Sequence, residues 1–227
     1  MLLYFVLLHT IAYIKIFFQD PLTFMWWCGT IREIQTEGEE MQITETDKQI
    51  MIKTARSNGA VGKNAILPRF ISEIRGLEDH LVLDFGCGKD AVHVQILRKK
   101  GFAYVYGVDL VPITDPNLTI SNGSFLYVEA LPWHLVYASN VLNVQPSFTA
   151  LRCTICKVSD YARVGVAFLS YPKSPRKLNI GKDEMLSILA PYFKSVTSFR
   201  YRNTTIFKCT GRKCQEMLER RLTLMND

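Results

Sequence analysis

The feature that most constrains the fold is a glycine turn that joins two apolar segments within residues 81–110, LVLDFGCGKDAVHVQILRKKGFAYVYGVDL. The first apolar segment ends in Asp84 and the second ends in Asp109, with a helix-like pattern over residues 91–100 between them. Two buried strands separated by a helix are typical of a βαβ unit in a parallel sheet. The carboxyl ends of such strands share one edge of the sheet, so we expect both acids to flank the turn.

Strands and helices alternate along the rest of the chain. We expect further strands at residues 124–129, 134–139 and 163–172, and helices at 47–57 (capped by Thr46), 64–76, 147–158, 181–193 and 212–225. Two β-rich segments around Arg202 and Asn203 predict an antiparallel hairpin. The predicted fold is therefore α/β, with a doubly wound, mostly parallel sheet that ends in an antiparallel hairpin.

The residues of the turn indicate the kind of ligand. Gly86 and Gly88 allow positive φ angles and a close approach of the backbone to a ligand, and Asp109 is placed to accept hydrogen bonds from ribose hydroxyls. A dinucleotide site has a third glycine, which is missing here, and a phosphate at the helix start, where Asp90 places a negative charge. The turn favours a cationic nucleoside without phosphate.

Here the sequence resembles a known family. The segments VLDFGCGKD and YGVDL resemble the first two motifs of the class I S-adenosylmethionine-dependent methyltransferases, YASNVLNV resembles their fourth motif, and the hairpin resembles their closing pair of strands. The resemblance implies S-adenosylmethionine as the cofactor. It also implies a set of cofactor-binding residues: Asp84, Gly86, Cys87, Gly88, Asp109, Leu110 and Ser139.

The methyl acceptor is expected over residues 139–143, Ser-Asn-Val-Leu-Asn. Enzymes of this class that methylate base amines carry a proline-containing motif there, which this chain lacks. Asn140 and Asn143 are the candidate catalytic residues because a side-chain amide can orient an acceptor, although either can instead cap the turn through local backbone bonds. No catalytic base is predicted. Val108, Leu110 and residues 124–129, with Glu129, are expected to form the adenine pocket.

The charge is unevenly distributed. Residues 152–227 hold 15 of the 27 Lys and Arg residues but 6 of the 21 Asp and Glu residues. This imbalance favours nucleic acid as the partner, and an ordinary solvated surface is the alternative interpretation. The basic residues singled out are Lys173, Arg176, Lys177, Arg200, Arg202, Lys208, Arg212 and Lys213.

Residues 1–18, MLLYFVLLHTIAYIKIFF, are almost entirely apolar. They predict either a membrane anchor or an upstream extension of the reading frame, with the true start at Met41. We expect four parts: an apolar extension (1–40), a helical lead-in (41–78), the cofactor-binding domain (79–210) and a basic C-terminal helix (211–227). The scattered cysteines fit reduced thiols in the cytoplasm, and Cys153 and Cys156, at zinc-like spacing, lie in a helical pattern that disfavours a metal site.

Two other functions stay open at this point. The departures from the family pattern at Asp90 and at residues 139–143 fit a module that binds the nucleoside without transferring a methyl group. The apolar N-terminus fits a membrane-associated methyltransferase that acts on a small or lipid substrate.

Overall fold

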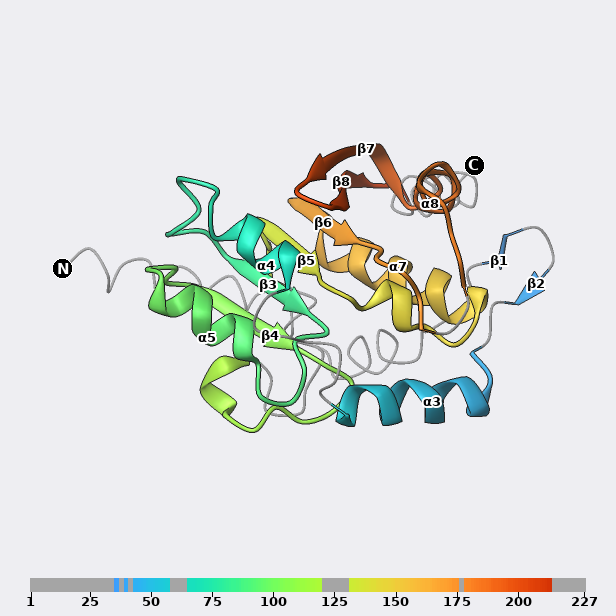
Figure 1. Cartoon of the computed structure of the whole chain (residues 1–227), viewed down its shortest axis with the longest axis horizontal. Coiled ribbons are helices and arrows are strands. Elements are labelled where there is room, and N and C mark those ends of the chain that lie inside the picture. Colours follow the sequence, from blue (N-terminus) through green and yellow to red (C-terminus); the bar gives the residue numbers. More distant parts are fainter. Residues whose placement is uncertain are drawn as a thin grey trace, which may run out of the picture. The chain divides into compact units, whose positions relative to one another are not determined.

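The computed structural model describes residues 35–36, 39–40, 43–57, 65–119, 131–175 and 178–213. The chain divides into two compact units, residues 1–42 and 43–227. In the first unit, β1 (Gln35–Thr36) pairs with β2 (Glu39–Glu40) in antiparallel register. All other described elements belong to the second unit (Figure 1).

The second unit is built on one six-stranded sheet in the order β4-β3-β5-β6-β8-β7. Its strands are β3 (Val82–Phe85), β4 (Val105–Val108), β5 (Leu135–Ala138), β6 (Val166–Ser170), β7 (Phe193–Tyr201) and β8 (Thr204–Arg212). The first four in chain order pair in parallel, and β8 pairs antiparallel with both β6 and β7. The predicted fold class and hairpin are confirmed. The strand order reverses beside β3, which makes the end of β3 the switch point where such sheets bind ligands.

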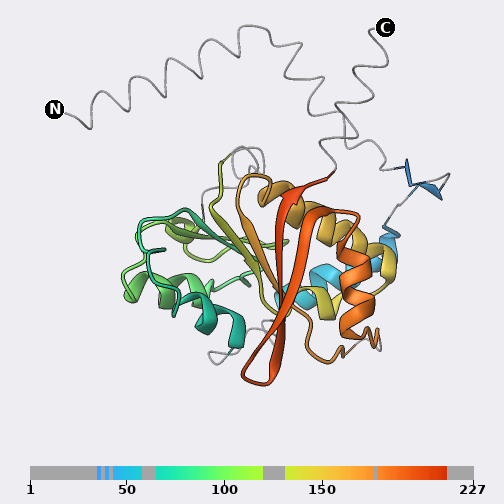
Figure 2. The ribbon, with the colours of Figure 1, turned by 90° about the horizontal axis from the view of Figure 1, so that it is seen from above.

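Helices cover both faces of this sheet (Figure 2). They are α3 (Glu45–Arg56), α4 (Ile66–Ile71), α5 (Val92–Lys99), α7 (Phe148–Tyr161) and α8 (Lys182–Leu189), with 3-10 turns η1 (Pro116–Leu118) and η2 (Leu142–Val144). One apolar cluster joins α4 and α5 to the sheet through residues such as Ile71, Leu97 and Tyr137. Every residue of β5 is buried, as expected for a central parallel strand with helices on both sides.

Two helix boundaries differ from the prediction. The N-cap of α3 is Thr44 rather than Thr46, because the Thr44 hydroxyl accepts the Asp47 amide at 3.1 Å and Thr46 already lies in the first turn. The helix expected to reach Gly76 ends at Ile71, where the Ser72 hydroxyl donates to the Arg69 carbonyl at 2.7 Å.

Several predictions lie outside the described residues: the apolar segment 1–18, the start at Met41, the strand 124–129 with Glu129, Arg176 and Lys177, and most of the helix 212–225. The segment after Asp109 is irregular apart from η1, as far as the structure describes it. None of the helices within the described ranges is long and apolar enough to cross a membrane.

The backbone packs closely around Gly165, just before the start of β6. A Cβ atom at this position would overlap the carbonyl oxygens of Trp133 and His134, which belong to backbone and cannot move independently. We expect Gly165→Ala to lower the free energy of unfolding by about 2 kcal/mol or more, on the scale of overpacking. Gly181→Ala is the matched control, because nothing lies within 4 Å of its added methyl group. Urea unfolding measures both, and equal stabilities of the two variants would contradict the packing described here.

Candidate functional site

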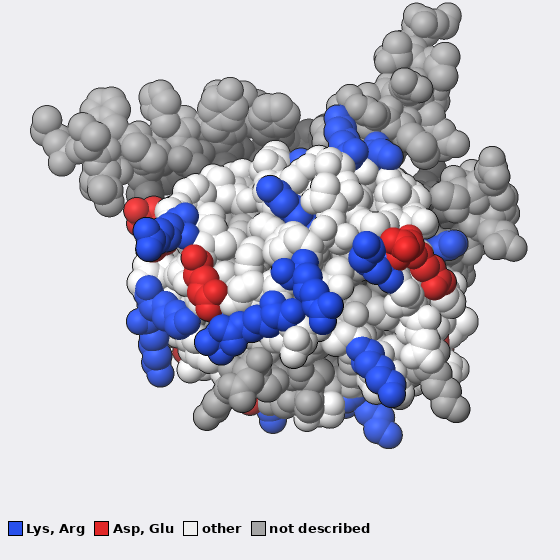
Figure 3. All heavy atoms as spheres, turned by 45° about the horizontal axis from the view of Figure 1, so that its top comes forward, with Lys and Arg blue, Asp and Glu red and all other residues white. Residues whose placement is uncertain are grey.

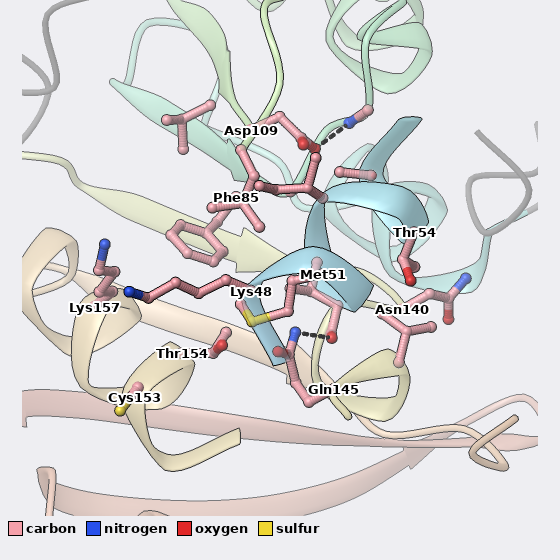
Figure 4. A pocket seen from close by; sticks show the side chains of 18 of the residues that line it. Lys48, Met51, Thr54, Phe85, Asp109, Asn140, Gln145, Cys153, Thr154 and Lys157 are labelled. Atoms are coloured by element: carbon pink, nitrogen blue, oxygen red, sulfur yellow. Dashed lines mark hydrogen bonds between the residues drawn. The ribbon is translucent and has the colours of Figure 1, made fainter. Parts of the chain in front are cut away.

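A cavity of about 450 Å³ opens where β3, β4 and β5 end. This volume is in the range of small-molecule sites. Its walls come from the turn after β3, the ends of β4 and β5, and the facing sides of α3 and α7 (Figure 4). The described residues that line it include Phe85, Gly86, Gly88, Val108, Asp109, Leu110, Ser139 and Asn140.

The glycine turn has the backbone conformation that its sequence predicts. Gly86 has φ 78° and Gly88 has φ 74°, both in the left-handed region that favours glycine. Gly86 also lies so close to Val141 that a Cβ atom would overlap the Val141 side chain. The Gly86 amide donates to the Val108 carbonyl at 2.7 Å, which ties the turn to the end of β4. The two glycines are thus required by sterics at the cavity wall.

Asp109 is fixed at the cavity wall by the glycine turn itself. Its Oδ2 accepts the Gly88 amide at 2.7 Å, and its Oδ1 accepts the Val111 amide at 3.4 Å (Figure 4). Burial raises the pKa of this carboxyl group, and the backbone donors, Gly88 first, oppose that rise. Each carboxylate oxygen keeps a further lone pair, so Asp109 can accept hydrogen bonds from a ligand while it holds the turn.

Asp90 has a local role, at the position of the last glycine in the (D/E)-x-G-x-G-x-G motif of the family that the turn resembles. Its Oδ1 accepts the Thr114 hydroxyl at 3.3 Å, and the Thr114 amide donates to the Lys89 carbonyl at 2.7 Å. The residue therefore connects the glycine turn to the loop that follows β4. Ala91, the next residue, has a positive φ of 42° at the start of α5.

Two predicted binding residues lie behind the cavity wall. Asp84 is 1% exposed, and its carboxyl group faces the buried Tyr137 hydroxyl. Burial raises the pKa of Asp84 to about 8; Tyr137 opposes the rise and the Asp109 charge adds to it. The Cys87 thiol packs against Gly107, and burial raises its pKa too. Asp84 and Cys87 therefore support the turn from beneath.

The two candidate catalytic asparagines are separated. Asn140 lines the cavity and has φ 59°, a left-handed conformation that asparagine tolerates better than most residues. Asn143 lies in η2 away from the cavity lining, where its Nδ2 donates to the Lys173 carbonyl at 3.3 Å and its carbonyl accepts the Ser174 hydroxyl at 2.6 Å. The structure thus brings Asn140 to the site, while Asn143 holds the loop after β6.

The sequence reasoning missed the wall formed by α3 and α7. The residues there include Lys48, Met51, Ile52, Cys153, Thr154, Lys157 and Tyr161, with Gln145 beside them. The sequence signal for α3 was an ordinary amphipathic pattern, and only the structure shows that no residue of this helix is buried. An apolar stripe without a buried residue indicates a face that borders a cavity. Gln145 also points to a ligand, because its Oε1 is buried without a partner among the described residues.

No protein-family model matches the chain, and no curated protein matches it in sequence. The magnesium protoporphyrin IX methyltransferase of Synechocystis PCC 6803, solved with bound S-adenosylmethionine, is similar at 17% identity and TM-score 0.42, over 75% of this chain and 86% of that one. A putative ribosomal RNA methyltransferase of Plasmodium falciparum is 12% identical, with TM-score 0.35 over 66% of this chain and 97% of that one.

A sugar N-methyltransferase from Streptoalloteichus sp. ATCC 53650 is 12% identical, with TM-score 0.38 over 82% of this chain and 85% of that one. All three are methyltransferases by name. At these identities the likeness concerns the fold, and the chemistry of this chain rests on the cavity.

The raised pKa of Asp84 predicts a pH dependence of stability. Between the ordinary carboxyl value near 4 and about 8, the folded protein keeps a proton on Asp84 that the unfolded chain has lost. This proton stabilises the fold fully below pH 4, and the contribution is lost as the pH rises through 8. Asp84→Asn, which stays neutral, should remove a slope approaching about 1.4 kcal/mol per pH unit.

Urea unfolding of both proteins at pH 5, 6.5 and 8 measures the difference. Asp79→Asn, at an exposed loop position, is the control and should keep the wild-type slope. Parallel stability curves for wild type and Asp84→Asn would show that Asp84 is ionised in the fold.

Proposed function

We propose that the protein is an S-adenosylmethionine-dependent methyltransferase. The observation that carries this proposal is the hydrogen bond of 2.7 Å from the Gly88 amide to Asp109, which sets a carboxylate beside an open glycine turn at the switch point of the sheet. In this arrangement Asp109 accepts the ribose hydroxyls, while Gly86 and Gly88 leave room for the amino acid part of the ligand.

The charges near the turn suit this ligand. The cofactor carries an ammonium and a sulfonium group, and Asp84 and Asp109 both lie close to the turn that would receive them. In the free protein Asp84 is largely neutral at pH 7, because its pKa is raised to about 8. A cation nearby lowers the pKa of a carboxyl group, so we expect cofactor binding to release part of the Asp84 proton.

Bound S-adenosylmethionine supplies an activated methyl group with a thioether as its leaving group. An acceptor atom would take this methyl group by in-line attack, with the carbon–sulfur bond breaking and its electron pair staying on sulfur. A neutral acceptor then loses a proton to solvent. The chain contributes mainly alignment, which lowers the barrier by holding the reactants in line. Asn140 lines the cavity after the end of β5, and we expect its side-chain amide to orient the acceptor, while Ser139 beside it stays a predicted cofactor-binding residue.

The charge of residues 152–227 predicts nucleic acid as the acceptor, and this stays a prediction that is separate from what the lining of the cavity favours. In the described part of the hairpin, Arg202 pairs with Glu73 at 3.8 Å and Arg212 pairs with Asp160. On the face that Figure 3 draws, Lys and Arg predominate, with a few Asp and Glu among them. Salt-dependent binding of DNA or RNA would support a phosphate-binding surface.

A module that binds S-adenosylmethionine without transferring its methyl group is the second candidate, favoured by Asp90 and by the absence of a proline motif at residues 139–143. Incubation with methyl-labelled S-adenosylmethionine and DNA, RNA, protein or small-molecule fractions separates the two. Label incorporated above the level of the Asp109→Ala variant supports the enzyme. Cofactor binding without incorporation into any fraction supports the module.

Asp109→Ala should lower the affinity for S-adenosylmethionine by about 1.5–3 kcal/mol, the scale of charged hydrogen bonds. Asp109→Asn keeps an acceptor for the Gly88 amide and loses the charge, so it should preserve stability better and still bind more weakly. Asp115→Ala, in the exposed loop beyond, is the control. Calorimetry measures all three. Unchanged affinity in both Asp109 variants would remove this residue from the site.

A further inference from the structure

The cavity has a second charged region, formed by two lysines from different helices. Of the described residues that line it, Lys48, Lys157 and Asp109 carry the formal charges. Lys48 belongs to α3 and Lys157 to α7, and in the close-up the Lys48 side chain extends toward Lys157 (Figure 4). Lys157 also lies near enough to the Cys153 thiol to oppose the rise in its pKa that burial causes. The two ammonium groups thus share the wall that borders Cys153.

The relative position of these two helices is fixed by a hydrogen bond. The Ser147 hydroxyl, which caps α7, donates to Asp47 Oδ2 of α3 at 2.6 Å across 100 residues of sequence. Asp47 comes directly before Lys48 in the chain, and its carboxylate is engaged in this hydrogen bond. The Lys48 ammonium is paired with Glu45 at 3.7 Å, between side chains that are 57% and 73% exposed. A pair so exposed is weak and is readily exchanged for a better anion.

With the cofactor bound, an anionic group at the wall that carries the two lysines would be electrostatically favourable. The proposed cofactor has a net positive charge, from two cationic groups and one carboxylate. Glu45, which is paired with Lys48, offsets part of the positive charge that the cofactor and the two lysines bring to the cavity. An anionic group placed between the two ammonium groups is attracted by both of them, and more strongly than in open water because the volume is partly enclosed. The aromatic ring of Phe85, which contacts Tyr161 with ring centroids 5.7 Å apart, offers an apolar surface next to the lysines.

We propose that the methyl acceptor is a small molecule with an apolar or aromatic body and an anionic group, a carboxylate or phosphate, held between Lys48 and Lys157. This inference rests on the proposed function, because the acceptor enters beside the bound cofactor. Its body lies against Phe85 and Met51, and the anion sets its orientation so that the reacting atom points toward the end of β5. Lys48 and Lys157 are specificity residues in this arrangement.

The test uses matched acids and uncharged counterparts on the full chain saturated with S-adenosylhomocysteine. The pairs are benzoate with benzamide, 4-hydroxybenzoate with 4-hydroxybenzamide, and phenyl phosphate with phenol. The first two pairs test for binding of a carboxylate, and the third tests for binding of a phosphate. We expect at least one acid to bind roughly tenfold more tightly than its counterpart, as two charged contacts allow. Lys48→Gln combined with Lys157→Gln should weaken that acid about fivefold or more. Lys53→Gln, an exposed lysine of α3 outside the cavity, should change nothing.

Equal binding of every acid and its counterpart would overturn the inference, as would an acid preference that survives in the double variant. Weaker binding of S-adenosylhomocysteine in the double variant, with acid binding unchanged, would assign the lysines to the carboxylate of the cofactor and also overturn it. Methyl label that enters DNA or RNA equally in wild type and double variant would do the same. Failure of the wild-type chain to bind S-adenosylhomocysteine would instead refute the proposed function. Titration of the acids in the absence of S-adenosylhomocysteine would still measure whether Lys48 and Lys157 bind an anion.

Discussion

The site depends on the hydrogen bond between the Gly88 amide and the Asp109 carboxylate. It joins the turn after β3 to the end of β4, and it forms because the parallel register pairs Asp84 with Gly107 and Phe85 with Val108. The left-handed conformation of Gly88 aims its N–H at that carboxylate. One contact therefore couples sheet register, turn conformation and the position of the acid that borders the cavity.

The sequence was sufficient to predict this part of the molecule because its signals are local. An apolar strand, two glycines at positive φ and an acid at the end of the next strand follow one another within thirty residues. The same reasoning predicted Asp84 as a binding residue, but it did not take into account the two-residue period of a strand. Successive side chains point to opposite faces, so Phe85 borders the cavity while Asp84 is buried beneath it.

The wall formed by α3 and α7 could not be predicted in the same way. Its two helices are about a hundred residues apart in sequence, and the bond that joins them, from Ser147 to Asp47, leaves no pattern in either segment. Each helix taken alone shows an ordinary apolar stripe. That the stripe of α3 borders a cavity rather than a core follows only from where the sheet ends and where α7 begins.

The charge of the cavity changes from one wall to another. The carboxylate of Asp109 lies at the glycine turn, and the ammonium groups lie at the helices, with Phe85 among the lining residues between them (Figure 4). A field of this kind stabilises a ligand pair in one orientation, with cationic groups toward Asp109 and an anion toward Lys48 and Lys157. Transfer in line needs the donor carbon and the acceptor atom to face each other in the middle of the cavity. If the proposed transfer takes place in this cavity, opposite charges at its walls would produce that alignment, and the specificity for the acceptor and the catalysis of transfer would then have the same physical origin.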